Sequence, residues 1–572
     1  MNETVEILFG LLGGLAIFLY GMNLMSDSLQ KVAGEKMRTI LGMLTKNPVL
    51  GVISGALVTA VLQSSSATTV MAIGFVSAGL MKLPQAISII FGANIGTTLT
   101  AQLIAFKLSD YIYAIIFIGF FIYFIAKKEK IKYVGATIFG FGLLFEGIET
   151  MGSVMKPLAT SPVFADMIQQ VANVPVLGVL VGAGMTLVVQ SSSATIAVLQ
   201  NIASTAGPDG VHSVIGLAGA IPVLLGDNIG TTITAVLASI GQSINAKRTA
   251  AAHCIFNISG ALIFVWIIGP YAKFIEWLSP AGPEIEVISR QIANAHTCFN
   301  VTLTLLWTPL IYIMVKLVTK IIPEKGEESV LSLSQARFID RKMLGQPMAA
   351  IELAANETIR VTDAIGDMII SLAESTGKKL KENCTEMLTD STQILALNHQ
   401  LQDYLSDILA GGKASERQSD RVTGMIFIVS NLNRVTENLN IIAKNVISTD
   451  ESKDGYSKAA ISDIHDFSKR LLGIYEIIVD ALVGDETIDL KKLERQRADI
   501  FDLRDEMFNA HLKRVRKGKC EAVLTAGYGE LLQALEAIGT CCIDMADLVE
   551  EQHTIKLAVK KNGDKEAAQE MV

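Results

Sequence analysis

A short polar run that occurs twice inside apolar sequence constrains this chain most. Residues 63–68 read Gln-Ser-Ser-Ser-Ala-Thr, and the same six residues return at 190–195. Each run lies in an apolar segment, 50–80 or 174–205, that is longer than the roughly 20 residues of a membrane-spanning helix. Non-helical backbone at that depth is tolerated only where protein or a wet cavity covers it. The pattern therefore predicts two re-entrant helical hairpins in a membrane protein.

A second motif follows each polar run. Residues 92–98 read Gly-Ala-Asn-Ile-Gly-Thr-Thr, and residues 226–232 read Gly-Asp-Asn-Ile-Gly-Thr-Thr. Two copies of one unit, at roughly 9–135 and 136–268, account for both recurrences. The glycines each lower helix stability by about 1 kcal/mol relative to alanine. We expect a helix break there, which would free carbonyls beside the oxygens of Asn94 and its threonine neighbours.

The orientation of the two copies follows from counting membrane crossings. If segment 50–80 is re-entrant, the first unit crosses three times and the repeats are inverted, whereas a full crossing would make them parallel. With the N-terminus outside, the inverted arrangement places 13 Lys and Arg residues of 1–320 in the cytoplasm and 4 outside. The positive-inside rule therefore favours inverted repeats and a cytoplasmic second half.

The charge composition divides the chain near residue 320. Residues 1–320 hold 17 Lys/Arg and 14 Asp/Glu, and residues 321–572 hold 31 and 42, for a net charge of −8. An acidic second half argues against nucleic acid as a partner. The six cysteines lack metal or redox spacing, which fits a reduced cytosolic setting. Without a metalloprotease or Walker motif, we expect neither an enzyme nor an ATP-driven pump, and no organic cofactor.

After residue 322 the pattern changes to long amphipathic helices. We expect six of them, folded as two three-helix bundles, at 347–376, 378–410, 417–449, 456–483, 488–516 and 522–556. The expected fold class is all-α: a polytopic membrane protein with two inverted repeats, plus a six-helix cytosolic domain. The expected divisions are a first transmembrane repeat, a second repeat with a final helix, a linker, the helical domain and a charged tail, at 1–135, 136–322, 323–345, 346–556 and 557–572.

A re-entrant hairpin has the chemistry to bind ions. Its second half-helix would begin at Ser64–Ser66, where free N–H groups and the positive end of the helix dipole suit an oxyanion. The oxygens of the serine, threonine, Asn and Gln side chains suit a hard cation such as sodium. Close helix packing through small residues is the alternative explanation. The duplication of both motifs favours a binding site.

These four motifs resemble the type II sodium/phosphate cotransporter family, over about residues 5–320. The resemblance implies a symporter in the cytoplasmic membrane lipid bilayer that moves inorganic phosphate with sodium, as a homodimer. It implies phosphate and sodium binding at Gln63, Ser64, Ser65, Ser66, Thr68, Asn94, Thr97, Thr98, Gln190, Ser191, Ser192, Ser193, Thr195, Asn228, Thr231 and Thr232. Asp227 stands where the first copy has Ala93, and this acid could bind sodium or face the cytosolic vestibule.

The second half is similar to PhoU-like domains, in which acidic helix faces bind metal clusters and take part in phosphate regulation. Acids three or four residues apart share a helix face. The resemblance makes six acids candidates for metal binding: Asp403, Asp407, Glu437, Asp502, Glu506 and Asp547. A solvated or salt-bridged helix face is the alternative.

A His-x-x-Phe-Asn motif also recurs, at His253–Asn257 and His296–Asn300. One helical turn separates each His from its Asn. Hydrogen bonds between helices and the sensing of protons or substrate are the two interpretations. Taken together, the sequence predicts a sodium-coupled phosphate transporter with a regulatory cytosolic domain. A phosphate exporter using the same site and a membrane-anchored phosphate sensor or scaffold are the alternatives.

Overall fold

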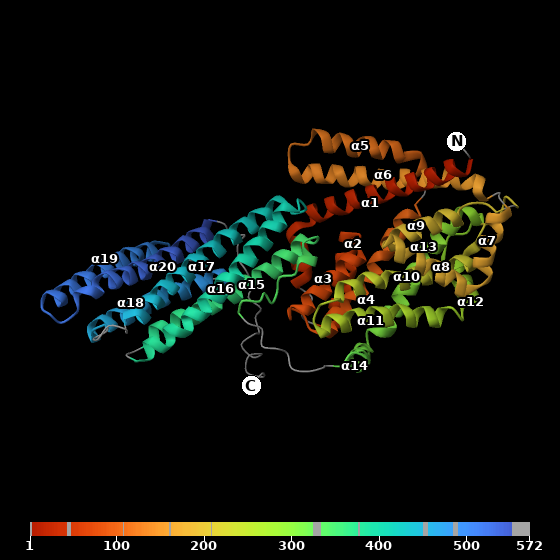
Figure 1. Cartoon of the computed structure of the whole chain (residues 1–572). Helices are drawn as coiled ribbons and strands as arrows, with labels where there is room; N and C mark the ends of the chain where they lie inside the picture. The colour runs from red at the N-terminus through yellow and green to blue at the C-terminus, as the bar shows by residue number, and fades with distance from the viewer. Residues whose placement is uncertain are drawn as a thin grey trace. The chain divides into compact units, whose positions relative to one another are not determined.

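The computed structural model describes residues 3–42, 47–106, 108–159, 162–207, 209–323, 333–375, 378–449, 456–483 and 490–551. Regular structure in these ranges is helical, apart from one isolated bridge between Ala206 and Ser213. The all-α expectation is therefore confirmed for the described residues. The chain divides into two compact units, Met1–Gly326 and Glu327–Val572. Their helices are labelled in Figure 1, and each unit is described by itself.

Two long helices of the first unit run side by side. Helix α1 (Glu3–Gly42) packs along α6 (Glu129–Ala159), and glycines bring their backbones together. A Cβ atom added at Gly14 would lie 2.9 Å from the Gly147 carbonyl, and one at Gly21 would lie 2.7 Å from the Gly140 carbonyl. Residue numbers rise along α1 from Gly14 to Gly21, whereas those of the contacted glycines on α6 fall from Gly147 to Gly140. Helices α1 and α6 are therefore antiparallel.

The expected break in each polar run is present. Helices α2 (Pro48–Leu62) and α3 (Ser65–Ser77) meet at the first run, and α8 (Pro175–Val189) and α9 (Ser192–Ala203) meet at the second. Both α2 and α8 begin with proline, whose fixed φ and missing N–H suit the first helical position.

The break expected at the second motif is absent, so that expectation was wrong. Helices α4 (Leu83–Ile104) and α10 (Gly216–Ser239) run straight through the two Asn-Ile-Gly-Thr-Thr motifs. The motif glycines serve close packing instead. A Cβ atom at Gly96 would lie 2.6 Å from the Ala56 carbonyl on α2, and one at Gly230 would lie 2.6 Å from the Ala183 carbonyl on α8. Helix contact offsets the low helix propensity of glycine.

Among the described residues, four helices are long and apolar enough to cross a membrane: Ile7–Val32, Leu83–Ile104, Glu129–Val154 and Gly216–Ser239. Three sharply bent pairs raise the number to seven if each pair is one span. They combine α7 (Pro162–Asn173) with α8, α11 (Ile244–Phe264) with α12 (Ile268–Leu278), and α13 (Glu284–Trp307) with α14 (Ile311–Ile321). Shorter apolar helices are α2, α3 and α5 (Ile112–Ile125), and α5 packs on α6.

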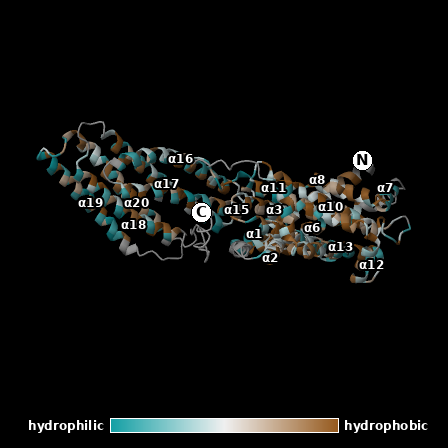
Figure 2. Ribbon diagram, turned by 90° about the horizontal axis from the view of Figure 1, so that it is seen from below, coloured by the Kyte–Doolittle hydropathy of each residue, from teal (hydrophilic) through white to brown (hydrophobic). Residues whose placement is uncertain are grey.

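Two of these helices depart from a single straight span. The segment 292–318 is not one helix, because the chain bends by 83° between Trp307 and Ile311. Helix α1 is 40 residues long, twice the roughly 20 residues that a span needs. Figure 2 shows hydrophobic residues concentrated on the helices of the first unit and mixed with hydrophilic ones along those of the second.

The second unit contains the six expected helices. Helices α15 (Pro347–Glu374), α16 (Lys378–Ala410) and α17 (Glu416–Thr449) pack together. Helices α18 (Lys458–Val483), α19 (Leu490–Arg516) and α20 (Thr525–Glu551) form a second group. The groups join through α15 against α18 and α17 against α20. The expected tail 557–572 lies outside the described residues.

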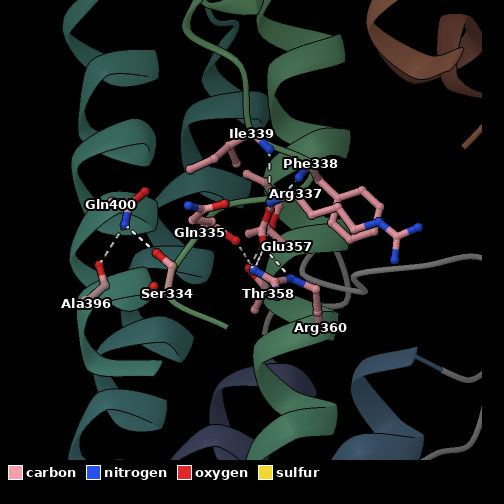
Figure 3. Close-up of polar contacts among 11 residues, drawn as sticks. Ser334, Gln335, Arg337, Phe338, Ile339, Glu357, Thr358, Arg360, Ala396 and Gln400 are labelled. Carbon is pink, nitrogen blue, oxygen red and sulfur yellow. Dashed lines mark hydrogen bonds and ion pairs between the residues drawn. The ribbon is translucent and has the colours of Figure 1, made fainter. Parts of the chain in front are cut away.

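The end of the expected linker is held on the first of these bundles (Figure 3). The buried carboxylate of Glu357 on α15 accepts hydrogen bonds from the N–H groups of Arg337 at 2.9 Å and Phe338 at 2.6 Å. The same carboxylate pairs with Arg360 at 2.6 Å. From α16, Gln400 donates to the Ser334 carbonyl at 2.9 Å. The stretch from Ser334 to Phe338 is thus fixed to α15 and α16.

Candidate functional site

The first hairpin tip turns on one residue in the left-handed region. Gln63 follows α2 with φ 51° and ψ 26°. Ser64 then caps α3, because its Oγ accepts a hydrogen bond from the Ala67 N–H at 3.2 Å. The carbonyl of Leu62, freed at the end of α2, accepts a hydrogen bond from Ser26 on α1. The reversal leaves the first N–H groups of α3 directed toward the tip.

The second tip repeats this geometry. Gln190 has φ 54° and ψ 26°, and Ser191 caps α9 by accepting from the Ala194 N–H at 3.3 Å. Among the described residues, Gln63 and Gln190 are the only non-glycine residues with positive φ. A left-handed glutamine is strained, so the surrounding packing must hold it there. The six-residue run therefore specifies one turn twice.

A threonine pair ties together the two halves of each hairpin. Thr59 lies 2.8 Å from Thr68 through their hydroxyl oxygens, and Thr186 lies 2.9 Å from Thr195. Thr68 and Thr195 were candidate site residues. Thr59 and Thr186 were missed, although their spacing of 127 residues equals that of the polar runs.

The candidate residues of the second motif make the same hydrogen bonds in both copies. The amide of Asn94 donates to the Ile90 carbonyl, and that of Asn228 to the Leu224 carbonyl, each at 2.9 Å. The four threonine hydroxyls also donate to carbonyls of their own helices, for the residues Thr97, Thr98, Thr231 and Thr232. Because these donors are committed, the side chains offer oxygen lone pairs to a ligand. That supply suits a cation better than an anion.

Each copy reaches across to the other. Helix α3 packs against α10, and α9 packs against α4. At the first tip, Thr234 on α10 lies 3.4 Å from Ser66 through their hydroxyl oxygens. Thr100, its equivalent on α4, donates instead to the Gln63 side-chain oxygen at 2.9 Å. The long helix that carries the second motif of each copy therefore packs against the second half of the other copy's hairpin, and Thr100 and Thr234 join the candidates.

The tips differ in exposure. Ser65 and Ser193 are buried, whereas Ser64, Ser66, Ser191 and Ser192 are partly exposed and Gln190 is exposed. None of the sixteen predicted site residues is charged. An anion at the tips would be held by N–H groups, hydroxyls and helix dipoles alone.

Asp227 stands apart as the acid of the second motif. Its side chain is fully buried, which excludes the vestibule position in this conformation. One carboxylate oxygen, Oδ1, lies 2.6 Å from the Thr186 hydroxyl. The acid thus extends the Thr186–Thr195 pair of the second hairpin.

A cavity of about 900 Å³ lies beside α9. It is lined by the ends of α4 and α9 and by Glu149 of α6. Gln200 and Asn201 also line it, and each has a buried side-chain oxygen without a hydrogen-bond partner among the described residues. Neither residue was among the predicted site residues, although an amide pair inside an apolar helix was a signal in the sequence.

The six acids proposed for metal binding lie on four helices of the second unit. Asp403 and Asp407 lie on α16, Glu437 on α17, Asp502 and Glu506 on α19, and Asp547 on α20. Asp407 lies 3.8 Å from Arg341, and Glu437 accepts a hydrogen bond from Asn433. The described residues contain no group of three or more His, Cys, Asp or Glu side chains placed to hold a metal ion. Metal binding there stays a prediction.

Comparison with known proteins places the chain in a family. The profile of the Na+/Pi-cotransporter family matches the chain twice, over residues 17–153 and 147–277. An uncharacterized protein of Bacillus subtilis, YqeW, is 33% identical over 308 residues, which are 54% of this chain and 96% of that protein. The chain belongs to the Na+/Pi-cotransporter family. Each match to the family profile includes one polar run and one Asn-Ile-Gly-Thr-Thr motif.

Other relatives cover different parts of this Na+/Pi-cotransporter family member. The "Putative inorganic phosphate export protein YjbB" of Salmonella typhimurium is 23% identical over 521 residues, 91% of this chain and 93% of that protein. The "Sodium-dependent phosphate transport protein 2A" of Rattus norvegicus is 38% identical over 99 residues, 17% of this chain and 15% of that protein. No solved structure matches. Family membership and the candidate spans indicate a multi-pass membrane transporter rather than an enzyme.

Proposed function

We propose that this protein is a secondary transporter that moves inorganic phosphate together with sodium. The observation that carries the proposal is the pair of broken hairpins, each with its second half packed on the other copy's long helix. A site shared between two repeats can open to either side as one repeat moves against the other. The relatives named as phosphate transport and export proteins support phosphate as the substrate.

Phosphate would bind at the tips and sodium beside them. The first N–H groups of α3 and α9 and the hydroxyls of Ser65 and Ser192 can donate to phosphate oxygens. The oxygens of Asn94 and Asn228, whose amide groups donate elsewhere, suit sodium. The two ions would neutralise part of each other's charge in a site whose sixteen predicted residues are all uncharged.

The two copies would be inverted repeats around this site. The supporting observation is that α1 and α6, which begin the two copies, pack antiparallel through equivalent glycines. The N-terminus would lie outside and the second unit in the cytoplasm, as the positive-inside count predicts. The second unit would be a PhoU-like regulatory domain, because its six helices pack as two groups of three.

Export through the same site is the second candidate function. It is favoured by the relative named as a phosphate export protein, which aligns with 91% of this chain, including most of the second unit. Ion gradients, rather than the fold, set the direction of a secondary transporter. In cells, where the protein has its native orientation in the membrane, net phosphate uptake or net phosphate release distinguishes the two directions.

Uptake of radiolabelled phosphate into proteoliposomes, with and without a sodium gradient, tests the proposal. The double variant Ser65→Ala, Ser192→Ala should lose flux by about tenfold or more per hydroxyl, the effect of losing a hydrogen bond to a charged ligand. Ser153→Ala, an exposed serine on α6, is the matched control and should transport normally. Sodium-independent flux in the unmodified protein would refute the coupling, and normal flux in the double variant would refute the paired-tip site.

A further inference from the structure

A buried acid lies against the second hairpin and has no counterpart at the first. Asp227 is fully buried on α10, at the position where α4 carries Ala93. Its Oδ1 contacts the Thr186 hydroxyl at 2.6 Å, and its Oδ2 has no hydrogen-bond partner among the described residues. A buried carboxylate without a partner is unfavourable, so this group calls for a positive charge or a proton.

The surrounding protein does not supply that charge. Helices α8, α9 and α3, which pack against α10, carry no acidic or basic residue within their bounds. Helix α7, which also packs against α10, contributes the acid Asp166. The buried ionisable side chains of α11, α12 and α13 are Arg248, His253, Tyr271 and His296. In the described part of the chain, none of these forms an ion pair or hydrogen bond with Asp227.

Hydrogen counting links the acid to the tip. Thr186 has one hydroxyl hydrogen, yet its oxygen lies 2.6 Å from Asp227 Oδ1 and 2.9 Å from Thr195 Oγ1. Thr195 in turn lies 3.4 Å from the Ser191 carbonyl at the tip. An ionised Asp227 accepts the hydrogen bond that the Thr186 hydroxyl can donate. When a proton or cation occupies the carboxyl, Thr186 can donate to Thr195 instead, and Thr195 donates to the Ser191 carbonyl.

The first hairpin has the same chain without this choice. Thr59 donates to Thr68 at 2.8 Å, and Thr68 donates to the Ser64 carbonyl at 3.2 Å. The methyl group of Ala93 cannot compete for the Thr59 hydrogen. The direction of the hydrogen bonds is therefore fixed in the first copy, and only in the second does it depend on a titratable group.

We propose that Asp227 is a binding site for one monovalent cation, a proton or sodium, whose occupancy sets the direction of the Thr186–Thr195 hydrogen bonds. The proposal rests on the proposed function, because it names a coupling ion for the second hairpin. Without a bound cation, the ionised Asp227 places a negative charge beside the hairpin that would hold phosphate. That charge opposes the binding of an anion. Occupancy removes that charge, so the cation and phosphate bind together.

Ion counting in proteoliposomes of the full chain tests the proposal. In the sodium arm, the ratio of radiolabelled sodium to phosphate flux should fall by about one ion in Asp227→Asn relative to the unmodified protein. In the proton arm, a trapped pH dye should instead report phosphate-driven proton movement that the variant loses. A change in either arm supports the proposal and identifies the ion. Ser153→Ala is the control that should keep both ratios.

A second variant guards against misfolding. Asp227→Ala introduces the residue that the first copy carries at the equivalent position, Ala93. This variant should lose the same coupled ion as Asp227→Asn. Infrared difference spectra of the unmodified protein, with and without sodium or acid, should contain a carboxyl band that both variants lack. Unchanged ion ratios in either folded variant, or an unchanged carboxyl band, would overturn the proposal. Sodium-independent flux in the unmodified protein refutes only the proposed sodium coupling, because the proton arm still tests Asp227.

Discussion

At the residue scale, the site depends on side chains whose hydrogen-bond donors are already committed. Thr97 and Thr98 donate to carbonyls of α4. The Ser64 hydroxyl oxygen accepts the hydrogen bond that caps α3. Gln63 joins the two half-helices in a conformation that favours glycine. The polar run therefore has a structural role besides its proposed binding role, and substitutions can separate the two.

Replacement of Gln63 measures the strain at the tip. Gln63→Gly and Gln63→Ala both remove the hydrogen bond with Thr100, but only glycine adopts φ 51° freely. We expect the glycine variant to be more stable than the alanine variant by about 1 kcal/mol. Thermal unfolding in detergent compares them. The same difference should be found at Gln190, and equal stabilities would contradict the strained turn.

At the element scale, the hairpins are held by backbone contact between helices rather than by large side chains. Gly226 on α10 lies so close to α8 that an added Cβ would be 2.8 Å from the Ala183 nitrogen. Gly184 on α8 faces open space. A side chain is therefore excluded by close packing at Gly226 but has room at Gly184.

Alanine substitution should separate these two glycines. Gly226→Ala should destabilise the protein by about 1–3 kcal/mol, because the backbones must move apart. Gly184→Ala should be neutral or stabilise by up to about 1 kcal/mol through higher helix propensity. Melting temperatures of the purified variants provide the measurement. Equal effects of the two substitutions would argue against packing through Gly226.

The second unit contains an element whose stability depends on pH. His511 on α19 stacks on Tyr528 of α20, and burial, together with the charge of Arg514, lowers the pKa of its imidazole. As the pH falls below the ordinary histidine pKa, His511 binds a proton more readily in the unfolded chain than in the folded chain. The stability from this group is present above the ordinary histidine pKa of about 6.5 and is lost as the pH falls below it.

Substitution of His511 should reduce this pH dependence. Between about pH 7.5 and about pH 5.5, the melting temperature of the second unit should fall less in His511→Gln than in the unmodified chain. Scanning calorimetry of the full chain at the two pH values gives the comparison. An identical fall in both proteins would show that His511 does not contribute.

At the scale of the whole molecule, the two units differ in what they require. The relative YqeW aligns over 96% of its length with 308 residues, 54% of this chain, so that relative has no counterpart to much of this chain. The first unit has its own buried core, in which α4 and α10 are the most enclosed long spans. The residues of that core all belong to the first unit.

Truncation after Gly326 should therefore leave a folded transporter. We expect residues 1–326 to insert into membranes and to retain phosphate flux, with altered regulation if the second unit controls it. Flux per molecule in proteoliposomes, normalised to reconstituted protein, is the measurement. A folded truncated chain with no flux would instead assign the second unit a direct part in transport.

The sequence predicted most of the helices, the duplicated unit and a helix break in each Gln-Ser-Ser-Ser run. These are local properties, because they follow from the apolar pattern and from the polar residues that interrupt it. It did not determine that α4 and α10 stay unbroken, because helix contact at Gly96 and Gly230 outweighs local propensity. Only the tertiary structure placed Thr234 beside Ser66 and buried Asp227 against Thr186. Those contacts join residues 168 and 41 positions apart, and packing, not local pattern, decides which such residues meet.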